Sequence, residues 1–292
     1  MNHIKISELF YSIQGEGKFQ GVPSVFLRTF GCNFKCQGFG MPRGELSNEA
    51  NDINPDLYTE YKSLPLVSTG CDSYASWDPR FKHLSPVLSI DSIANAIVDT
   101  LPYKEWKDEH LVITGGEPLL GWQRAYPKLL EHDKMQGLTA ITFETNGTQK
   151  LSSEFKDHLR DWISNGFKNE ITFSVSAKLP CSGEKWEDAI KPEVVCDYEE
   201  IGTTYLKFVV ATKEDVLDAE CAVGAFRAAG FEGHVYLMPV GGVESVYSLN
   251  NKNVALEAMK RGWRYSDRLQ VRSEEHTSEL QSRETISYAV FC

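Results

Sequence analysis

Two cysteines near the amino terminus have the spacing that points most directly to chemistry. Cys32 and Cys36 follow an apolar, strand-like run from Ser24 to Phe30, so both thiols lie where a strand gives way to a loop. Two thiolates four residues apart at such a position can bind one face of an iron–sulfur cluster. Further along, the segment from Ile113 to Pro118 (ITGGEP) predicts a second strand that ends in a glycine pair and an acid.

This combination of motifs resembles the radical S-adenosylmethionine (SAM) enzymes. In that family three cysteines hold a [4Fe–4S] cluster, and its open iron takes the amino and carboxylate groups of SAM. The usual third cysteine, three residues after Cys36, is absent, because Phe39 stands at that position. The Gly-Gly-Glu-Pro segment alone is a weak signal, since Pro118 also suits the first turn of a helix and the segment can be a plain strand-to-helix turn.

A candidate for the missing ligand follows a long polar segment. Cys71 begins the sequence CDSYASWD, which resembles a narrower family, the 7-carboxy-7-deazaguanine synthases. In that family the third cysteine is followed by Asp and then by Thr or Ser, whose hydroxyl binds Mg²⁺. The resemblance implies that Cys71 is the third cluster ligand, that Ser73 binds magnesium, and that residues 37–70 are an insertion within the cluster loop. An ordinary loop thiol at Cys71 is the alternative.

The resemblance extends over nearly all of residues 4–271 and implies further site residues. The substrate would be bound by Ile13, Gln14, Gly15, Glu16, Arg28 and Thr114. SAM would be bound by Gly70, Cys71, Asp72, Gly116, Glu117, Glu144, Asn146, Ser176, Ala177, Lys178, Met238, Pro239, Val240 and Gly241. Two of these depart from the family pattern, since Ala177 replaces a proline and Met238 replaces a glutamine. Taken without the resemblance, a strand arginine such as Arg28 is more often a salt-bridged structural residue.

The resemblance also implies an activity, the conversion of 6-carboxy-5,6,7,8-tetrahydropterin to 7-carboxy-7-deazaguanine with loss of ammonia, in the queuosine and 7-deazaguanine pathway. A 5′-deoxyadenosyl radical would abstract hydrogen from C6 of the pterin, the ring would contract, and SAM would be regenerated. Arg28 would pair with the substrate carboxylate, and Mg²⁺ at Ser73 would orient the ring. The implied requirements are a [4Fe–4S] cluster, SAM, Mg²⁺ and a reducing electron donor, with a homodimer as the expected assembly.

Three other functions remain open on the sequence. Another radical SAM reaction, such as glycyl-radical activation, would share the cluster but would not need Asp72 and Ser73. A zinc-stabilised binding protein could use the three cysteines with a histidine such as His83, because zinc sites tolerate long gaps between ligands. A catalytically inactive relic is the third possibility.

The elements that would position these residues alternate along the chain. Strand patterns occur at 5–10, 24–30, 111–113, 139–143, 171–174, 205–210, 234–238 and 268–271, and helix patterns at 90–97, 122–135, 154–165, 213–229 and 250–261. Such alternation predicts an α/β fold, a parallel sheet with flanking helices that forms a partial (β/α) barrel of the radical SAM type. Functional groups should then gather at the carboxyl ends of the strands.

Composition narrows the class of protein. The 292 residues carry a net charge of −11 and no basic run, which argues against nucleic acid as a partner. No apolar run approaches the length of a membrane span, and the amino terminus lacks the apolar core of a signal peptide, so we expect a cytoplasmic protein without a membrane partner. The seven cysteines suggest ligands or buried thiols more than disulfides, and Cys181, Cys196 and Cys221 are scattered.

The tail from Arg272 to Cys292 differs in origin from the rest. Its sequence resembles one reading frame of a common sequencing-library adapter. We therefore expect one radical SAM domain over residues 1–271 and a non-native tail over 272–292, so Cys292 is no site candidate.

Overall fold

The computed structural model describes residues 1–241 and 251–269, and a nine-stranded sheet forms its centre. The strand order is β3-β1-β2-β4-β5-β6-β7-β8-β9. β1 pairs antiparallel with both β2 and β3, whereas every neighbouring pair from β2 to β9 is parallel. The strands are β1 (His3–Ile13), β2 (Pro23–Thr29), β3 (Val87–Ser89), β4 (His110–Gly115), β5 (Ala140–Thr145), β6 (Glu170–Val175), β7 (Thr203–Val210), β8 (Val235–Pro239) and β9 (Arg264–Tyr265).

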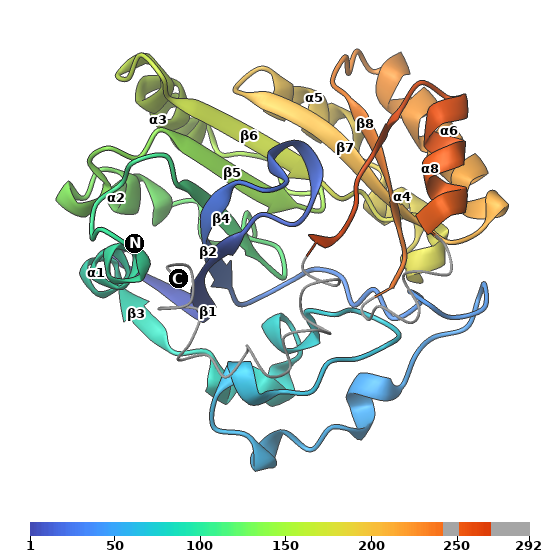
Figure 1. Cartoon of the computed structure of the whole chain (residues 1–292), viewed down its shortest axis with the longest axis horizontal. Helices are drawn as coiled ribbons and strands as arrows, with labels where there is room; N and C mark the ends of the chain where they lie inside the picture. Colours follow the sequence, from blue (N-terminus) through green and yellow to red (C-terminus); the bar gives the residue numbers. More distant parts are fainter. Residues whose placement is uncertain (242–250, 270–292) are drawn as a thin grey trace, which may run out of the picture.

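The longer helices lie around the outer side of this sheet (Figure 1). They are α1 (Ile90–Thr100), α2 (Tyr126–Leu130), α3 (Ser153–Ser164), α4 (Trp186–Ala189), α5 (Pro192–Glu199), α6 (Lys213–Ala228) and α8 (Asn251–Lys260). Local sequence fixes where they begin: Ser89 and Ser152 cap α1 and α3 through their side-chain oxygens, and Thr212 with Asp215 forms a capping box on α6. None of the helices in the described residues is long and apolar enough to cross a membrane.

The main core lies between the helices and one face of the sheet. It is built from aliphatic and aromatic residues that the strands and helices turn toward each other. Phe143 on β5 stacks on Phe173 on β6 with ring centroids 5.6 Å apart, and Phe173 in turn stacks on Tyr198 of α5 at 4.7 Å. The opposite face carries both aromatic and polar side chains, among them the stacked pair Phe10 and Phe26 and the buried Lys207.

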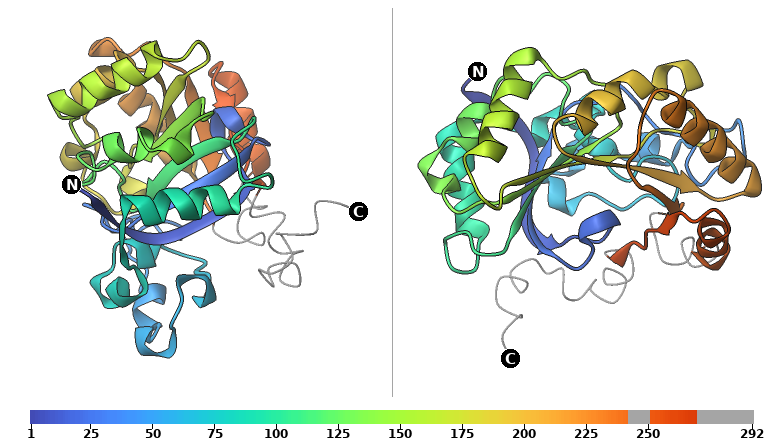
Figure 2. Two further views of the ribbon diagram at one scale, coloured as in Figure 1. Left: turned by 90° about the vertical axis from the view of Figure 1, so that its left-hand side faces the viewer. Right: turned by 90° about the horizontal axis from the view of Figure 1, so that it is seen from above.

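Residues 37–70, which we call the excursion, extend away from the sheet on one side of the molecule (Figures 1 and 2). The excursion forms three short 3-10 turns, Glu49–Asp52, Pro55–Leu57 and Tyr61–Ser63. Together with the turns that follow Cys71 it encloses a separate small core around Tyr74 and Phe81. The carboxylate of Glu49 accepts four hydrogen bonds, from the backbone and hydroxyl groups of Ser68 and Thr69. These bonds join the first half of the excursion to its last residues.

The predicted α/β class and parallel sheet are confirmed, and most strands fall where the apolar runs placed them. Two predictions are wrong. The helix expected over 122–135 is only α2 with a 3-10 turn at Asp133–Met135, because Pro127 at its first turn fixes a later start. The strand expected over 268–271 lies earlier, as β9; Arg268 and Leu269 are not in a strand, and residues 270–271 lie outside the described range.

Candidate active site

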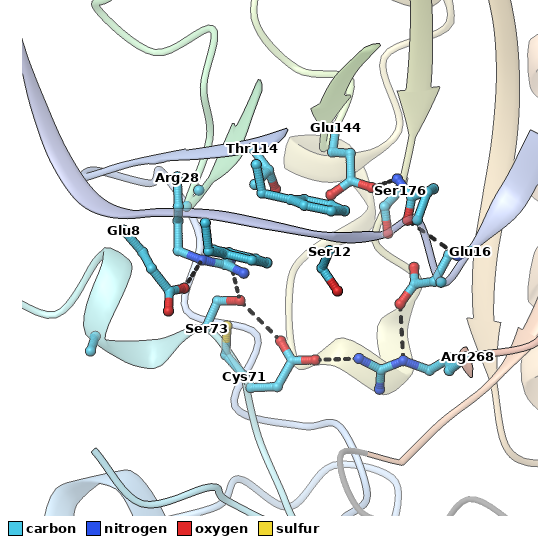
Figure 3. Close-up of a pocket in the computed structure, with 18 of the residues that line it drawn as sticks. Glu8, Ser12, Glu16, Arg28, Cys71, Ser73, Thr114, Glu144, Ser176 and Arg268 are labelled. Carbon is cyan, nitrogen blue, oxygen red and sulfur yellow. Dashed lines mark hydrogen bonds and ion pairs between the residues drawn. The ribbon is translucent and has the colours of Figure 1, made fainter. Parts of the chain in front are cut away.

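A single large cavity of about 1200 Å³ opens at the carboxyl ends of the parallel strands. Its wall combines the ends of β2, β4, β5, β6, β7 and β8 with β1, the excursion and the turn after Cys71. Figure 3 shows side chains from these distant segments pointing into one space. The cavity is where a parallel α/β sheet is expected to bind its ligands.

The three cysteines of the sequence prediction lie together on this wall, and we call them the cysteine site. Cys32, Cys36 and Cys71 all line the cavity and pack around Phe34 and Ala189. Their loops are held by backbone contacts. The amide of Phe34 donates to Cys32 Sγ at 3.4 Å, and Gly70 N donates to Phe39 O at 2.7 Å just before Cys71. The excursion therefore leaves the sheet after Cys36 and returns to place Cys71 beside the first two thiols.

A carboxylate organises the loop between the first two cysteines. Glu184 Oε1 accepts from the amides of Lys35 and Cys36 at 2.8 and 2.7 Å. Cys36 itself has φ of 52°, in the left-handed region that non-glycine residues seldom adopt. Two hydrogen bonds to one charged oxygen stabilise this strained turn, so the direction of the Cys36 side chain is fixed by the protein before any ligand binds.

Burial sets the protonation state of the cysteine site. It raises the pKa of Cys32 to about 12 and that of Cys71 to about 11, and it raises the pKa of Cys36 well above its ordinary value. Lys178 is a cation that acts on all three thiols and lowers each pKa in part. Without a metal the thiols are therefore protonated, and a bound cationic group would be needed to ionise them.

The donor set fits a cluster better than a single ion. No group of three or more His, Cys, Asp and Glu side chains among residues 1–241 and 251–269 is arranged to hold one metal ion. Thiolates of a [4Fe–4S] cluster bind separate irons and need not converge on a point, and three soft sulfur donors on one cavity wall suit such a cluster. His83, the histidine of the zinc alternative, is not on the cavity wall and lies 3.3 Å from the carbonyl of Tyr58.

The glycine pair after β4 is needed for close packing against the first cysteine loop. A Cβ on Gly116 would lie 2.4 Å from Gly31 O and 2.7 Å from Cys32 Cβ, and Gly115 has φ of +142°. Any side chain at either position would push the Cys32 loop away from the sheet. Both glycines also line the cavity, so they position the cysteine site and leave backbone exposed to a ligand.

Glu117, predicted to bind SAM, is turned away from the cavity. It is fully buried and its carboxylate accepts from Thr145 Oγ1 at 2.8 Å, Asn146 N at 2.6 Å and Leu119 N at 3.0 Å. Burial raises its pKa to about 7 in spite of these donors. In this conformation Glu117 links the ends of β4 and β5 and does not line the cavity.

A continuous series of charged and polar contacts crosses the cavity, and we call it the ion-pair chain (Figure 3). Lys207 pairs with Glu16, Glu16 with Arg268 at 3.0 Å, and Arg268 with Asp72 at 2.7 Å. Ser73 Oγ lies 3.2 Å from Asp72 Oδ1 and accepts from Arg28 Nη1 at 3.0 Å, and Arg28 Nε pairs with Glu8 at 3.2 Å. The members are Lys207, Glu16, Arg268, Asp72, Ser73, Arg28 and Glu8.

The cations of this chain stay charged although they are buried. Burial alone would lower the pKa of Lys207, but Glu16 and Glu144 outweigh it and raise the pKa. The pKa of Arg28 is raised in the same way by Tyr61, Glu8 and other neighbours against the effect of burial. The cavity therefore holds fixed positive charge at several points, each already paired with a carboxylate.

Comparisons with known proteins show the family to which the chain belongs. No family model matches the chain. A 7-carboxy-7-deazaguanine synthase from Halobacterium salinarum is 32% identical over 283 residues, which cover 92% of this chain and 89% of the relative. The chain belongs to the 7-carboxy-7-deazaguanine synthase family. A synthase of the same name from Rhodopirellula baltica is 28% identical, with 91% of this chain and 85% of the relative covered.

The fold agrees with a solved structure as well. The crystal structure of QueE from Escherichia coli superposes with a TM-score of 0.51 at 20% identity, covering 91% of this chain and 93% of that one. This likeness concerns the fold, and it supports the arrangement of sheet and helices described above.

Most residues that the family resemblance implied for this synthase family member do meet at the cavity. Those on its wall are Ile13, Gln14, Gly15, Glu16, Arg28, Cys32, Cys36, Gly70, Cys71, Asp72, Ser73, Thr114, Gly116, Glu144, Asn146, Ser176, Lys178, Met238, Val240 and Gly241. Glu117, Ala177 and Pro239 are not on the wall. Their implied roles as SAM contacts remain predictions.

Sequence reasoning missed many further wall residues, among them Glu8, Tyr61, Trp77, Lys207 and Arg268. Lys207 offered a signal, because a lysine within the apolar strand TYLKFVV has to find a buried anion. Glu8 similarly interrupts the strand opposite Arg28, with which it is in register. For the other three no comparable signal is present, since their positions depend on turns and on the closing segment after β9.

Proposed function

We propose that this protein is a 7-carboxy-7-deazaguanine synthase, a radical SAM lyase that converts 6-carboxy-5,6,7,8-tetrahydropterin to 7-carboxy-7-deazaguanine with loss of ammonia. The observation that carries the proposal is that three cysteines from residues 32–71 share one cavity with a buried, charged arginine at position 28. The three cysteines support a cluster, and Arg28 supports an anionic substrate. Family membership supports the combination.

Cys32, Cys36 and Cys71 would hold the cluster, and SAM bound to it supplies a 5′-deoxyadenosyl radical when reduced. The chain's own contribution is to orient SAM and exclude water. Asn146, Ser176 and Lys178 lie on the wall of the cavity that also holds the cysteine site. Lys178 Nζ donates to Ser176 Oγ at 2.9 Å and acts on all three thiols, so it is placed to face the anionic thiolates and the SAM carboxylate together.

The substrate would lie along the ion-pair chain. Arg28 has a planar fork of donors suited to a carboxylate, and only its Nε and Nη1 have partners in the described part of the chain, Glu8 and Ser73. The pterin carboxylate would take the remaining donors. Gln14 Nε2 donates to Glu144 Oε1 at 3.0 Å, so an amide and a carboxylate lie side by side on the wall, and they would bind the polar edge of a pterin ring.

The proposed function includes a Mg²⁺ ion, for which Ser73 would be the protein ligand. Mg²⁺ binds oxygen ligands and usually keeps several waters. The protein therefore needs to supply only one ligand, the Ser73 hydroxyl, when the substrate supplies another oxygen. In the structure Ser73 Oγ accepts from Arg28. It would be released for a cation when Arg28 turns to the substrate carboxylate, so magnesium and substrate should bind together.

Several properties enter only as expectations from the family. These are a reducing electron donor, a homodimer, a cytoplasmic location and a single domain over residues 1–271 with the excursion as an insertion. The adapter-like residues 272–292 lie outside the described range. A test can therefore use residues 1–271, the proposed domain.

The decisive experiment is an anaerobic turnover assay on reconstituted protein with SAM, Mg²⁺, reductant and 6-carboxytetrahydropterin, read by mass spectrometry. We expect 7-carboxy-7-deazaguanine. If 5′-deoxyadenosine forms without that product, the radical SAM class stands and the substrate is wrong, as it would be for an activating enzyme. A protein with a full cluster that forms neither compound would be an inactive relic.

A further inference from the structure

We propose that Arg268 is a positioning residue that ties residues 14–17, which we call the substrate loop, to the turn of the third cysteine and so sets the distance between substrate and cluster. The inference rests on the proposed function, because it requires SAM bound at a cluster and a pterin bound beside it. Neither the family resemblance nor the comparisons assign Arg268 to the site.

The guanidinium of Arg268 contacts three segments that are far apart in the chain. Its Nε donates to Glu16 Oε1 of the substrate loop at 3.0 Å, and its Nη2 donates to Asp72 Oδ2 of the third-cysteine turn at 2.7 Å. Its Nη1 donates to the carbonyl of Gly241, which follows β8. The planar fork of an arginine fixes the directions of these donors, which the flexible ammonium of a lysine does not.

The backbone that follows β9 is held against the same loop (Figure 1). Ser266 Oγ accepts from Gly17 N at 2.9 Å, and Leu269 N donates to Gly15 O at 3.1 Å. Ser266 is itself fixed to the sheet, because its amide donates to Leu237 O of β8 at 2.9 Å. The guanidinium is therefore presented from a backbone that is anchored both to the sheet and to the substrate loop.

Charge explains why a cation is needed at this position. Glu16 and Asp72 are anions on two different segments of the cavity wall, and both pair with Arg268. Figure 3 shows the guanidinium directed at the Glu16 carboxylate, and both side chains are only 13% exposed, so water and salt screen the pair weakly. Two carboxylates that share a cation are drawn together, whereas without the cation they repel each other. Removing the guanidinium should therefore separate the substrate loop from the third-cysteine turn.

This separation matters because the reaction depends on distance. SAM would be held at the cysteine site and the pterin by the substrate loop, so different segments hold the two reactants. A misplacement of about 1 Å can cost about 100-fold in rate. When the C6 hydrogen of the pterin is out of reach, cleavage of SAM ends in free 5′-deoxyadenosine and methionine, with the electron from the reductant and the hydrogen atom from a C–H bond of buffer or protein.

The first test compares the products of Arg268→Met and of the wild type, as reconstituted full-length proteins with SAM, Mg²⁺, reductant and 6-carboxytetrahydropterin. Arg268→Met should keep the iron and sulfide content of the wild type, while its ratio of 7-carboxy-7-deazaguanine to 5′-deoxyadenosine should fall about 100-fold. Arg264→Met is the matched control, because Arg264 contacts Tyr236 and His234 off the cavity wall, and it should keep the ratio. A wild-type ratio in Arg268→Met, or loss of its cluster, would overturn the inference.

A second test needs neither the cluster nor turnover. In the metal-free full-length proteins, hydrogen–deuterium exchange of the substrate loop should be faster in Arg268→Met than in the wild type and unchanged in Arg264→Met. Peptides from β5 should exchange equally in all three proteins, which shows that the variants are folded. Equal exchange of the substrate loop in Arg268→Met and the wild type would refute the tie.

A third variant separates geometry from charge. Arg268→Lys keeps the positive charge but not the fork, so its product ratio should stay well below that of the wild type. A wild-type ratio in Arg268→Lys would refute the bridging role of the guanidinium. A wild-type chain that forms 5′-deoxyadenosine without 7-carboxy-7-deazaguanine would instead overturn the proposed function, and this inference with it.

Discussion

The cysteine site and the ion-pair chain share one cavity but are built on opposite principles. At the cysteine site burial dominates, and it holds Cys32, Cys36 and Cys71 in their neutral form with only partial help from Lys178. Along the ion-pair chain every buried cation has an anionic partner, and the groups stay charged in the protein alone. The cysteine site becomes charged only when a cofactor binds, whereas the ion-pair chain is charged in the protein alone.

Because of this difference, we expect the two regions to respond differently when a side chain is removed. Loss of one thiol removes a bond to iron that nothing nearby can replace. Loss of one member of the ion-pair chain leaves its buried partner unpaired, which is costly but local. Geometry at the cysteine site comes from backbone turns, while geometry in the chain comes from side chains separated by as many as 252 residues.

The largest effect is expected from Cys71→Ala, which tests whether the excursion returns to complete the cysteine site. We expect loss of cluster assembly, because Cys32 and Cys36 alone cannot hold three irons. Iron and labile sulfide after anaerobic reconstitution provide the measurement. Cys181→Ala is the matched control, since that thiol lies off the cavity wall and contacts Val209 O. Equal iron content in both variants would refute the assignment of Cys71 as a cluster ligand.

Arg28→Met breaks the ion-pair chain at the position proposed to bind the substrate carboxylate. It also leaves Glu8 without its partner. Removing one member of a buried, hydrogen-bonded charge pair costs about 3 kcal/mol, so kcat/KM should fall about 100-fold. Iron content should stay at the wild-type level. Arg261→Met, whose side chain pairs with Glu220 and Glu257 away from the cavity, should keep its kcat/KM; a fall of similar size there would contradict the assignment.

Glu117→Gln tests the claim that burial dominates next to the cysteine site. The folded pKa of Glu117, about 7, lies above the ordinary 4.5, so the folded state holds this proton more tightly than the unfolded state. Its contribution to stability is therefore complete below pH 4.5 and lost as the pH rises to 7. Relative to Glu117→Gln, the metal-free wild type should lose about 3 kcal/mol across that window.

Urea unfolding of both proteins at several pH values measures this difference. Above pH 7 the two curves should run parallel. A difference in unfolding free energy that stays constant from pH 4.5 to 8 would show that the three hydrogen bonds to Glu117 keep it ionised, contrary to the account.

The smallest effect is expected from Tyr61→Phe, which asks whether the excursion takes part in the ion-pair chain. Tyr61 lines the cavity beside Arg28, its hydroxyl lies 2.9 Å from Ser76 Oγ, and burial raises its pKa to about 12. Loss of one neutral hydrogen bond, about 1 kcal/mol, should raise the KM for the pterin about fivefold with little change in kcat. Tyr58→Phe, in the same excursion but off the cavity wall, is the control, and equal behaviour of the two variants would remove Tyr61 from the site.

The sheet and the cysteine site could be predicted from sequence for a physical reason. Apolar runs such as SVFLRT in β2 are local signals, and parallel strands bring their carboxyl ends together whatever the loops between them do. The return of Cys71 after the excursion followed from the resemblance of its CDS motif to the family pattern. Spacing along the chain would not have predicted it.

The ion-pair chain could be predicted only in part, because its contacts carry no local signal. Arg268 was placed in a strand, yet its guanidinium joins Glu16 of the first loop to Asp72 of the third-cysteine turn. Glu117 shows the opposite case, in which a motif predicts a contact that the structure does not have. Its motif indicated a ligand contact, but burial and three donors from neighbouring residues turn the carboxylate inward. Single-sequence patterns predict which strand end a residue occupies but not which partner it meets there.

The most direct test of the central claim is ⁵⁷Fe Mössbauer spectroscopy of the reconstituted wild-type protein, recorded with and without SAM. We expect iron and sulfide in equal amounts as a [4Fe–4S] cluster, with one iron site changing its signal when SAM is added, because three cysteines leave one iron open. A cluster that SAM leaves unchanged, or a protein that binds zinc without sulfide, would contradict it.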